Sequence, residues 1–215
     1  MISIIIPACN EEKYISKTLD SIRSQSFKNY EIIVVCDGCT DKTAKKAKSA
    51  DKVVILKRRE GPGVAKNKGA EKAKGDVLVF LDADTEITEG LLHDIFKNKN
   101  KYLIGTAKIK PSNNKFKHKL FMALKNHFVC PFGVTNGIVF CKKDTFFENK
   151  GFPHIKKREE GIFVRDLKKR GKFYISRYYV INSTRRFDKK GYVKVIGYWI
   201  KEALKPSNED YEVIR

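Results

Sequence analysis

Two carboxylates one residue apart, Asp82 and Asp84, are the clearest chemical feature of this 215-residue chain. They follow the apolar run Val77–Leu81, which is typical of a strand buried on both faces. Carboxylate oxygens suit hard divalent cations, and Mg²⁺ typically binds through one or two of them together with substrate phosphates. By itself such a pair is more often a solvated turn that caps the next helix through Thr85 or Thr88, but at the rim of a parallel sheet it favours a metal site.

Strands and helices alternate through the first 96 residues. The expected strands are Ile2–Ile6, Ile32–Val35, Val53–Leu56 and Val77–Leu81. The first expected helix begins at Asn10, and the other three cover Asp41–Lys48, Val64–Lys74 and Glu89–Phe96. Such a pattern predicts an α/β fold with a parallel sheet, whose ligands gather beyond the carboxyl ends of the strands. The polar clusters Pro7–Glu11, Cys36–Asp41 and Asp82–Asp84 should therefore meet at one rim of the sheet.

The cluster Cys36-Asp37-Gly38-Cys39 has three interpretations. Asp37 could accept hydrogen bonds from a base or a ribose, and Gly38 would let a ligand approach the backbone closely. The same residues could form an Asx turn that caps a helix. The C-x-x-C spacing also allows a redox pair, whereas the sequence lacks the second pair and the spaced histidines that a zinc site would need.

The glycine-containing segment Gly61–Gly69 opens the third expected helix. It matches neither the P-loop pattern nor G-x-G-x-x-G, so it indicates neither of these nucleotide motifs. Lys66 and Asn67 could still point from the start of the helix into the site, although an exposed helical turn is the preferred interpretation.

The second half of the chain is less regular. Its expected strands are Ile104–Ile109, Gly137–Cys141 and Phe173–Ile181, and its expected helices are Phe116–Asn126, Glu159–Arg170 and Tyr192–Leu204. The sequence shows no repeats or linkers, which favours one continuous domain over residues 1–215. The last helix carries apolar side chains on one face, which favours packing on the core; interfacial contact with a membrane is the alternative.

The charge of the chain is divided unequally between its halves. Lys and Arg number 45 against 25 Asp and Glu, a net charge of +20. Residues 1–96 hold 16 basic and 15 acidic side chains, whereas residues 97–215 hold 29 and 10. The excess predicts an acidic binding partner or an anionic membrane surface for the second half, the alternative being a lysine-rich background.

The sequence has no stretch of about 18 apolar residues, and its start lacks a basic region. Five cysteines without short regular spacing do not suggest a secreted disulfide scaffold. We therefore expect a cytoplasmic protein, with a peripheral position at the inner face of the membrane as a further option.

Four segments in order resemble the nucleotide-sugar signatures of family-2 glycosyltransferases with the GT-A fold. They are Pro7-Ala-Cys-Asn-Glu11, Val34-Val-Cys-Asp-Gly-Cys-Thr-Asp41, Gly63-x-Ala-x-Asn-x-Gly69 and Phe80-Leu-Asp-Ala-Asp-Thr85. Weaker similarity continues through Asn136–Cys141, Phe146–Phe152, Glu159–Glu160 and Ser183–Gly191. The resemblance implies a single GT-A domain with a Rossmann-like, mostly parallel sheet flanked by helices. Residues 1–96 would bind the nucleotide sugar and residues 97–215 the acceptor, in an enzyme of the hexosyltransferase type (EC 2.4).

The resemblance also implies roles for single residues on the donor side. The nucleotide-sugar site would comprise Pro7, Asn10, Glu11, Asp37, Lys66, Asn67, Asp82, Ala83, Arg185 and Arg186. Among them, Asp37 would bind the uracil or other base, and Asp82 the ribose and the sugar. Asp84 would hold Mg²⁺ or Mn²⁺ on the diphosphate.

The implied chemistry is an inverting single displacement. Glu160, or Glu159 beside it, would act as the general base that takes the proton of the acceptor hydroxyl. Arg185 or Arg186 would stabilise the leaving diphosphate. The alternatives are an acidic first helical turn for the two glutamates and a solvated basic pair for the two arginines.

The implied partners are a nucleotide-diphosphate sugar and a glycan or lipid-linked acceptor such as a polyprenyl phosphate; nucleic acid is not expected. Three other functions stay open at this point. A nucleotidyltransferase could use the same kind of sheet and metal site, and a basic nucleic-acid-binding protein would explain the charge. A thiol oxidoreductase would require a low pKa for Cys36.

Overall fold

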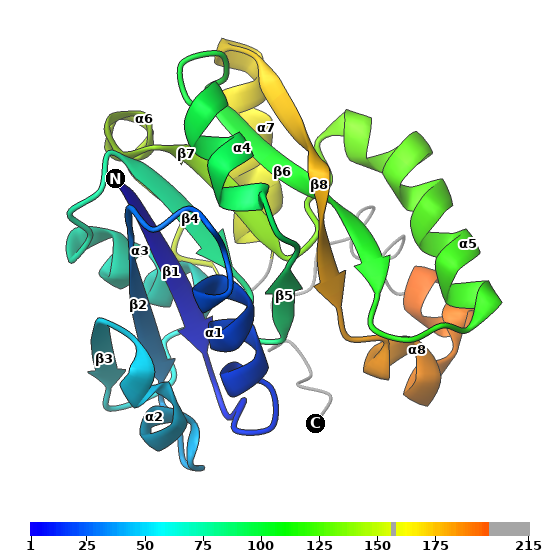
Figure 1. Ribbon diagram of the computed structural model, residues 1–215, viewed down its shortest axis with the longest axis horizontal. Coiled ribbons are helices and arrows are strands. Elements are labelled where there is room, and N and C mark those ends of the chain that lie inside the picture. Colours follow the sequence, from blue (N-terminus) through cyan, green and yellow to red (C-terminus); the bar gives the residue numbers. More distant parts are fainter. Residues whose placement is uncertain (156–157, 198–215) are drawn as a thin grey trace.

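The computed structural model describes residues 1–155 and 158–197. These residues form an eight-stranded sheet of order β3-β2-β1-β4-β7-β6-β8-β5 with helices on both faces (Figure 1). The strands are β1 Ile2–Ala8, β2 Tyr30–Asp37, β3 Lys52–Leu56, β4 Val77–Leu81, β5 Thr85–Ile87, β6 Ile104–Pro111, β7 Ile138–Lys142 and β8 Phe173–Asn182. The α-helices are α1 Ile15–Arg23, α2 Thr43–Lys46, α3 Pro62–Glu71, α4 Leu91–Asn98, α5 Phe116–Leu124, α6 Lys143–Glu148, α7 Glu159–Arg170 and α8 Arg185–Lys190.

The first half of the chain builds the parallel part of the sheet. β1 lies between β2 and β4 and is parallel to both, and β3 extends the sheet beyond β2 in the same direction. Ile4 packs with α1 and α4 in one apolar cluster, whereas Ile5 packs with α3 and α7 in the other. Figure 1 shows these two layers, with α1 and α4 in front of the sheet and α3 and α7 behind it. The expected α/β fold with a mostly parallel sheet is confirmed.

The second half adds the mixed part of the sheet and closes the site. β7 is antiparallel to both β4 and β6, and β8 runs parallel to β6. The end of β8 pairs with β5, with Thr85 opposite Asn182. This pairing brings the residues that follow β8 next to the turn that follows β4, although the two segments are far apart in the sequence.

The structure differs from the sequence-based expectation mainly in short elements. The sequence pattern does not predict β5, α6 or α8, which have three, six and six residues and are too short to show a hydrophobic period. The helix expected over Asp41–Lys48 is the short α2 followed by a 3₁₀ turn. The helix expected to reach Asn126 is α5 followed by a π-helical turn at Lys125–Val129.

The last expected helix, Tyr192–Leu204, is described only as far as residue 197. Residues 192–197 are helical, the ring of Tyr192 stacks on Phe187 with centroids 4.7 Å apart, and Val195 is buried. The described part of this helix therefore packs inward; its remainder lies outside the described residues. Within residues 1–155 and 158–197, no helix is both long and apolar enough to span a bilayer.

Gly69 determines how closely α3 lies on the sheet. A Cβ atom at this position would lie 2.3 Å from Cγ2 of Ile5 and 3.2 Å from Cγ2 of Val35. We expect Gly69→Ala to lower the free energy of unfolding by about 1–3 kcal/mol, because α3 would have to shift away from β1 and β2. Urea unfolding followed by circular dichroism measures this change.

The matched control is Gly161→Ala in α7, where the new Cβ would meet no atom of the described residues within 4 Å. This variant should keep its stability or gain slightly, because alanine favours helix. Equal losses in the two variants would contradict the packing role given to Gly69.

Candidate active site

Three loops meet at the carboxyl ends of β1, β2 and β4. Asn10, with a left-handed φ of 57°, joins the first two: its Oδ1 accepts hydrogen bonds from the backbone amides of Thr40 (2.7 Å) and Asp41 (3.2 Å). Pro7 pairs with Val35 of β2 but lies beyond the last residue pair that β1 shares with β4, which explains a proline in a central strand. The structure thus brings the polar clusters together at one rim, as the strand order requires.

Asp37 lies at this rim but is engaged by the backbone. Its Oδ1 accepts a hydrogen bond from the amide of Glu60 (2.6 Å), and its Oδ2 accepts one from the amide of Gly61 (2.9 Å). The neighbouring Gly38 has a φ of 61°, and a Cβ there would lie 2.5 Å from the backbone nitrogen of Arg59. Asp37 therefore fixes the loop between β3 and α3, and a base would meet a carboxylate that already has two partners.

The two thiols of the C-x-x-C segment lie close together and are not oxidised. Their mutual hydrogen bond raises the pKa of Cys36, which is also buried, and lowers the pKa of Cys39 to about 7. The Cys39 thiol donates to the carbonyl oxygen of Ala8 (3.2 Å), a bond that only the protonated form makes and that opposes this lowering. The raised pKa of Cys36 is the opposite of what a reactive redox cysteine needs.

A buried lysine occupies the centre of the site. Lys66, at 2% exposure, donates from Nζ to Oε1 of Glu159 (3.0 Å) and to Oε1 of Glu160 (2.5 Å). Burial alone would lower the pKa of Lys66, but the charges of Glu160, Glu159 and Asp82 raise it, so the ammonium stays charged. Gly63 permits this arrangement, because a Cβ there would lie 2.9 Å from the carbonyl oxygen of Pro153. The exposed helical turn expected at Lys66 is thus wrong, since α3 turns this residue inward onto α7.

Of the two glutamates, Glu160 is the more accessible. The side chain of Glu160 is 18% exposed against 10% for Glu159. Burial raises the pKa of Glu160, but the charge and hydrogen bond of Lys66 and a hydrogen bond from Thr135 outweigh it and leave the pKa below its usual value. Thr135 donates to the second carboxylate oxygen of Glu160 at 2.7 Å. Glu160 is therefore an ionised, oriented carboxylate near the surface.

Asn67 has a different role from its neighbour. Its Nδ2 donates to the carbonyl oxygen of Phe152, and its Oδ1 accepts from the amide of Phe152, both at 2.9 Å. This side chain therefore ties α3 to the segment before α7, and both of its polar atoms have backbone partners there. Ala83 is also used structurally, because its carbonyl oxygen accepts a hydrogen bond from Thr18 of α1 (2.8 Å).

Arg185, the first residue of α8, bridges two carboxylates from the first half. Its guanidinium donates two hydrogen bonds to Glu11 (3.1 and 3.2 Å) and lies 2.9 Å from Oδ2 of Asp84. It also lies over the ring of Tyr14, 4.4 Å from its centroid. Burial raises the pKa of Glu11, and Arg185 offsets part of this increase. The side chain of Arg186 lies outside the described part of the structure.

The carboxylates at this rim fit a divalent cation. Burial and the charges of Glu160, Asp84 and Glu159 raise the pKa of Asp82 to about 7, with Lys66 offsetting part of the increase. The site therefore has more carboxylate charge than its own cations balance. Within the described residues no group of three or more His, Cys, Asp and Glu side chains could hold a metal ion by itself. Asp84 and Asp82 could supply the one or two carboxylates that Mg²⁺ uses when phosphates complete its coordination.

Sequence reasoning missed two residues of this site. Thr135 orients Glu160 and Tyr14 supports Arg185, yet neither carries a pattern that marks it in the sequence. Both act through side chains far away in the chain, so only the fold reveals them.

A comparison with known protein families finds a match over most of the chain. The model of the family described as Glycosyl transferase family 2 matches residues 3–169. The chain belongs to this family. Membership favours a glycosyltransferase over the nucleotidyltransferase, nucleic-acid-binding and thiol oxidoreductase hypotheses, and it confirms the resemblance seen in the four signature segments.

The chain is also similar to curated glycosyltransferases. The chain is 28% identical over 192 residues to the GalNAc(5)-diNAcBac-PP-undecaprenol beta-1,3-glucosyltransferase of Campylobacter jejuni. The aligned segment covers 81% of this chain and 62% of that protein. The chain spans less than two thirds of the length of the curated relatives that it matches first.

Two solved structures share the GT-A fold at low identity. The mannosyltransferase PcManGT of Pyrobaculum calidifontis, in complex with GDP-Man and Mn²⁺, superposes with a TM-score of 0.70 at 16% identity, over 97% of this chain and 65% of that one. S. aureus TarS in complex with UDP-GlcNAc superposes with a TM-score of 0.67 at 20% identity, over 85% of this chain and 58% of that one.

Lys66→Met tests the central ion pairs. The variant leaves Glu159 and Glu160 without their cation, so we expect the free energy of unfolding at pH 7 to fall by about 3–5 kcal/mol. In the native protein the pKa of Glu160 is lower than in the unfolded chain. The ionised Glu160 therefore stabilises the fold at pH values above its unfolded pKa, and this stabilisation is lost as the pH falls. Without Lys66 the pKa of Glu160 should rise instead, so the deficit should shrink toward pH 4. Urea unfolding across this pH range measures both effects.

Lys68→Met is the control on the same helix, because Lys68 forms only an exposed ion pair with Glu71 (3.3 Å). The free energy of unfolding of Lys68→Met should fall by less than about 1 kcal/mol. A Lys66→Met deficit that is equally small, or that does not change with pH, would contradict the buried ion pairs.

Proposed function

We propose that the protein is an inverting, metal-dependent glycosyltransferase that moves a sugar from a nucleotide-diphosphate donor to an acceptor hydroxyl or phosphate. The observation that carries the proposal is that Asp82 interacts electrostatically with two groups of charged side chains. One group is Asp84 with its partner Arg185, which also binds Glu11; the other is Lys66 with Glu160. A donor diphosphate beside the first group would present its sugar to a base in the second.

Asp84, together with Asp82, would hold Mg²⁺ or Mn²⁺ on the donor side. When bound, this cation would stabilise the negative charge of the departing diphosphate. The guanidinium of Arg185 lies 2.9 Å from Asp84. It could turn to the diphosphate oxygens and stabilise the same leaving group through its charge. The complexes of PcManGT with GDP-Man and Mn²⁺ and of TarS with UDP-GlcNAc support a nucleotide-sugar donor of this class.

Glu160 would take the proton of the acceptor hydroxyl. Thr135 and Lys66 hold its carboxylate in one orientation, and its lowered pKa keeps it ionised at neutral pH, which is the form that can take a proton. A single base and one displacement at the anomeric carbon would invert its configuration. We assign Glu159 to positioning, because it is the more buried of the pair and lies against Gly63.

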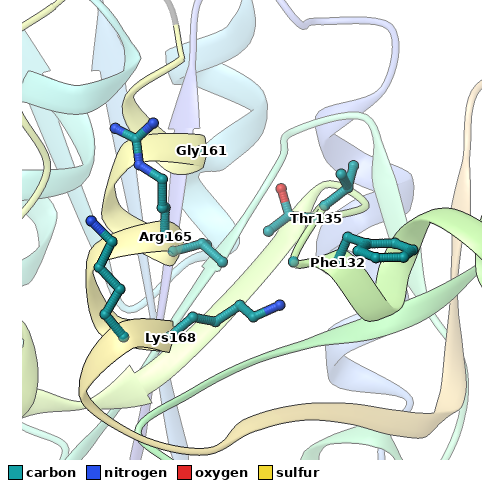
Figure 2. A pocket seen from close by; sticks show the side chains of 9 residues that line it. Phe132, Thr135, Gly161, Arg165 and Lys168 are labelled. Carbon is teal, nitrogen blue, oxygen red and sulfur yellow. The ribbon is translucent and has the colours of Figure 1, made fainter. Parts of the chain in front are cut away.

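A pocket beside Glu160 would receive the acceptor in the half formed by residues 97–215. It has a volume of about 570 Å³ and is lined by Phe132, Gly133, Val134, Thr135, Gly161, Val164, Arg165, Lys168 and Lys169. Figure 2 shows Lys168 extending from α7 toward the loop that carries Phe132 and Thr135. Three cations among these residues suit an anionic acceptor, such as an acidic glycan or a polyprenyl phosphate.

Asp84→Ala should abolish turnover of the sugar nucleotide without unfolding the protein, because it removes a ligand of the proposed cation. The rate of nucleoside diphosphate release, measured with added Mn²⁺ over a panel of sugar nucleotides, should fall by about 100-fold or more. Glu86→Ala, two residues further on, is the control and should keep the rate. Undiminished turnover in Asp84→Ala would contradict the metal assignment, and release of pyrophosphate from nucleoside triphosphates would favour a nucleotidyltransferase.

Glu160→Gln should keep donor binding but lose transfer by roughly 10²–10⁴-fold, because an amide cannot take the proton. Calorimetry measures donor affinity, and the rate of sugar transfer measures the chemical step. Asp166→Asn, an acid-to-amide change on the same helix, should leave both unchanged. If Glu160→Gln transfers at the native rate, the base lies elsewhere, and Glu159→Gln is the next variant to measure.

A further inference from the structure

A row of large apolar side chains lies exposed on α5 and the turns that follow it. The exposed fractions are 77% for Phe116, 49% for Leu120, 47% for Leu124, 61% for Phe128 and 81% for Phe132. These five residues, here called the apolar stripe, recur at every fourth position. Figure 1 shows α5 at the outer side of the molecule, beyond β8. A large patch of exposed apolar side chains often marks an interaction surface.

The backbone changes its winding along the stripe. A spacing of four residues exceeds the 3.6 residues of an α-turn, so the positions from Phe116 to Leu124 drift gradually around α5. The wider π-helical turn at Lys125–Val129, which contains Phe128, reverses part of this drift, and a 3₁₀ turn at Cys130–Phe132 follows it.

The opposite face of α5 is the one that packs on the protein. His118 and Met122 are buried, and the ring of Phe121 contacts those of Phe187 and Tyr192 at centroid distances of 5.1 and 4.8 Å. The helix thus has a core-facing side of its own, so the stripe is a second apolar face and not a displaced core face.

Lysines flank the stripe, and its own segment of the chain contains no acid. Lys115, Lys117, Lys119 and Lys125 lie in this segment, and the sequence has no Asp or Glu between Asp94 and Asp144. Lys115 pairs with Asp188 of α8 at 2.9 Å. An apolar face bordered by lysines suits the boundary between acyl chains and anionic headgroups. A second copy of this chain would place like charges opposite each other, which disfavours self-association through this face.

We propose that the apolar stripe docks the protein on an anionic lipid bilayer. Phe132 belongs both to the stripe and to the pocket beside Glu160, and Thr135 of the same loop donates to Glu160 at 2.7 Å. The bilayer would therefore lie at the mouth of the acceptor pocket. This position extends the proposed function to acceptors carried by the membrane, but docking itself requires neither donor nor acceptor.

Co-sedimentation of the full chain with vesicles tests the proposal without any substrate. The protein should bind vesicles of phosphatidylcholine with about 30% phosphatidylglycerol, bind pure phosphatidylcholine weakly, and lose binding as the salt concentration rises. Equal binding to both kinds of vesicle, or to neither, would overturn it.

Variants locate the surface. Phe116→Ser with Phe128→Ser should lower the partition coefficient by about tenfold or more, whereas Ile55→Ser with Phe147→Ser, exposed apolar residues elsewhere, should not. Lys117→Glu with Lys119→Glu should also weaken binding. Lys13→Glu, just before α1, with Lys17→Glu on α1 makes the same charge change and should have a much smaller effect. Equal effects in the stripe and control pairs would overturn the proposal, even if the native protein binds.

Two further measurements distinguish docking on a bilayer from self-association and from an effect on the donor site. Sedimentation velocity without lipid should give the same oligomeric state for the native protein and for Phe116→Ser with Phe128→Ser. A different oligomeric state in the variant, with unaltered vesicle binding, would overturn docking and show that the stripe joins copies of the chain. Donor affinity should be equal in both proteins, so a failure of docking and a failure of the proposed glycosyltransferase activity are distinguishable.

Discussion

A buried ammonium group holds the centre of the site together. Nζ of Lys66 contacts Glu159 and Glu160 at the start of α7 and interacts with the charge of Asp82 at the end of β4. Removing such a charge from water costs several kcal/mol, which only close carboxylates can offset. The three acids in turn would repel one another without it. The orientation of the proposed base therefore depends on a lysine that need not touch either substrate.

A second cation completes a crossed arrangement. Lys66 comes from the first half of the chain and pairs with acids of the second, whereas Arg185 comes from the second half and pairs with Glu11 and Asp84 of the first. The pairing of β5 with β8 makes the latter contact possible. Each half of the chain thus neutralises the other's carboxylates, and the two sides of the proposed reaction are joined by ion pairs that cross between them.

Much of this could be predicted from the sequence, for identifiable reasons. The strands of the first half are apolar on both faces, so their positions and the convergence of their polar ends follow from the pattern alone. The role of Lys66 could not be predicted, because the alternation of small and charged residues in α3 resembles an exposed helix until Gly63 and Gly69 are seen against α7 and β1. The signature segments assign Asp37 and Asn67 to the donor, but the hydrogen bonds of both side chains go to nearby backbone. Short elements such as β5 and α8 carry no period, so the position of Arg185 beside Asp84 emerges only from the folded sheet.

The position of the bound cation tests the central claim most directly. Crystals of the protein with Mn²⁺ and a nucleoside diphosphate would locate the metal through its anomalous scattering. The account predicts a manganese peak between Asp84 and the diphosphate, with Lys66 still paired to Glu159 and Glu160 on the other side of Asp82. A nucleotide bound at this rim with manganese away from Asp84, or a diphosphate seated beside Glu160, would contradict the division of the site into a donor side and an acceptor side.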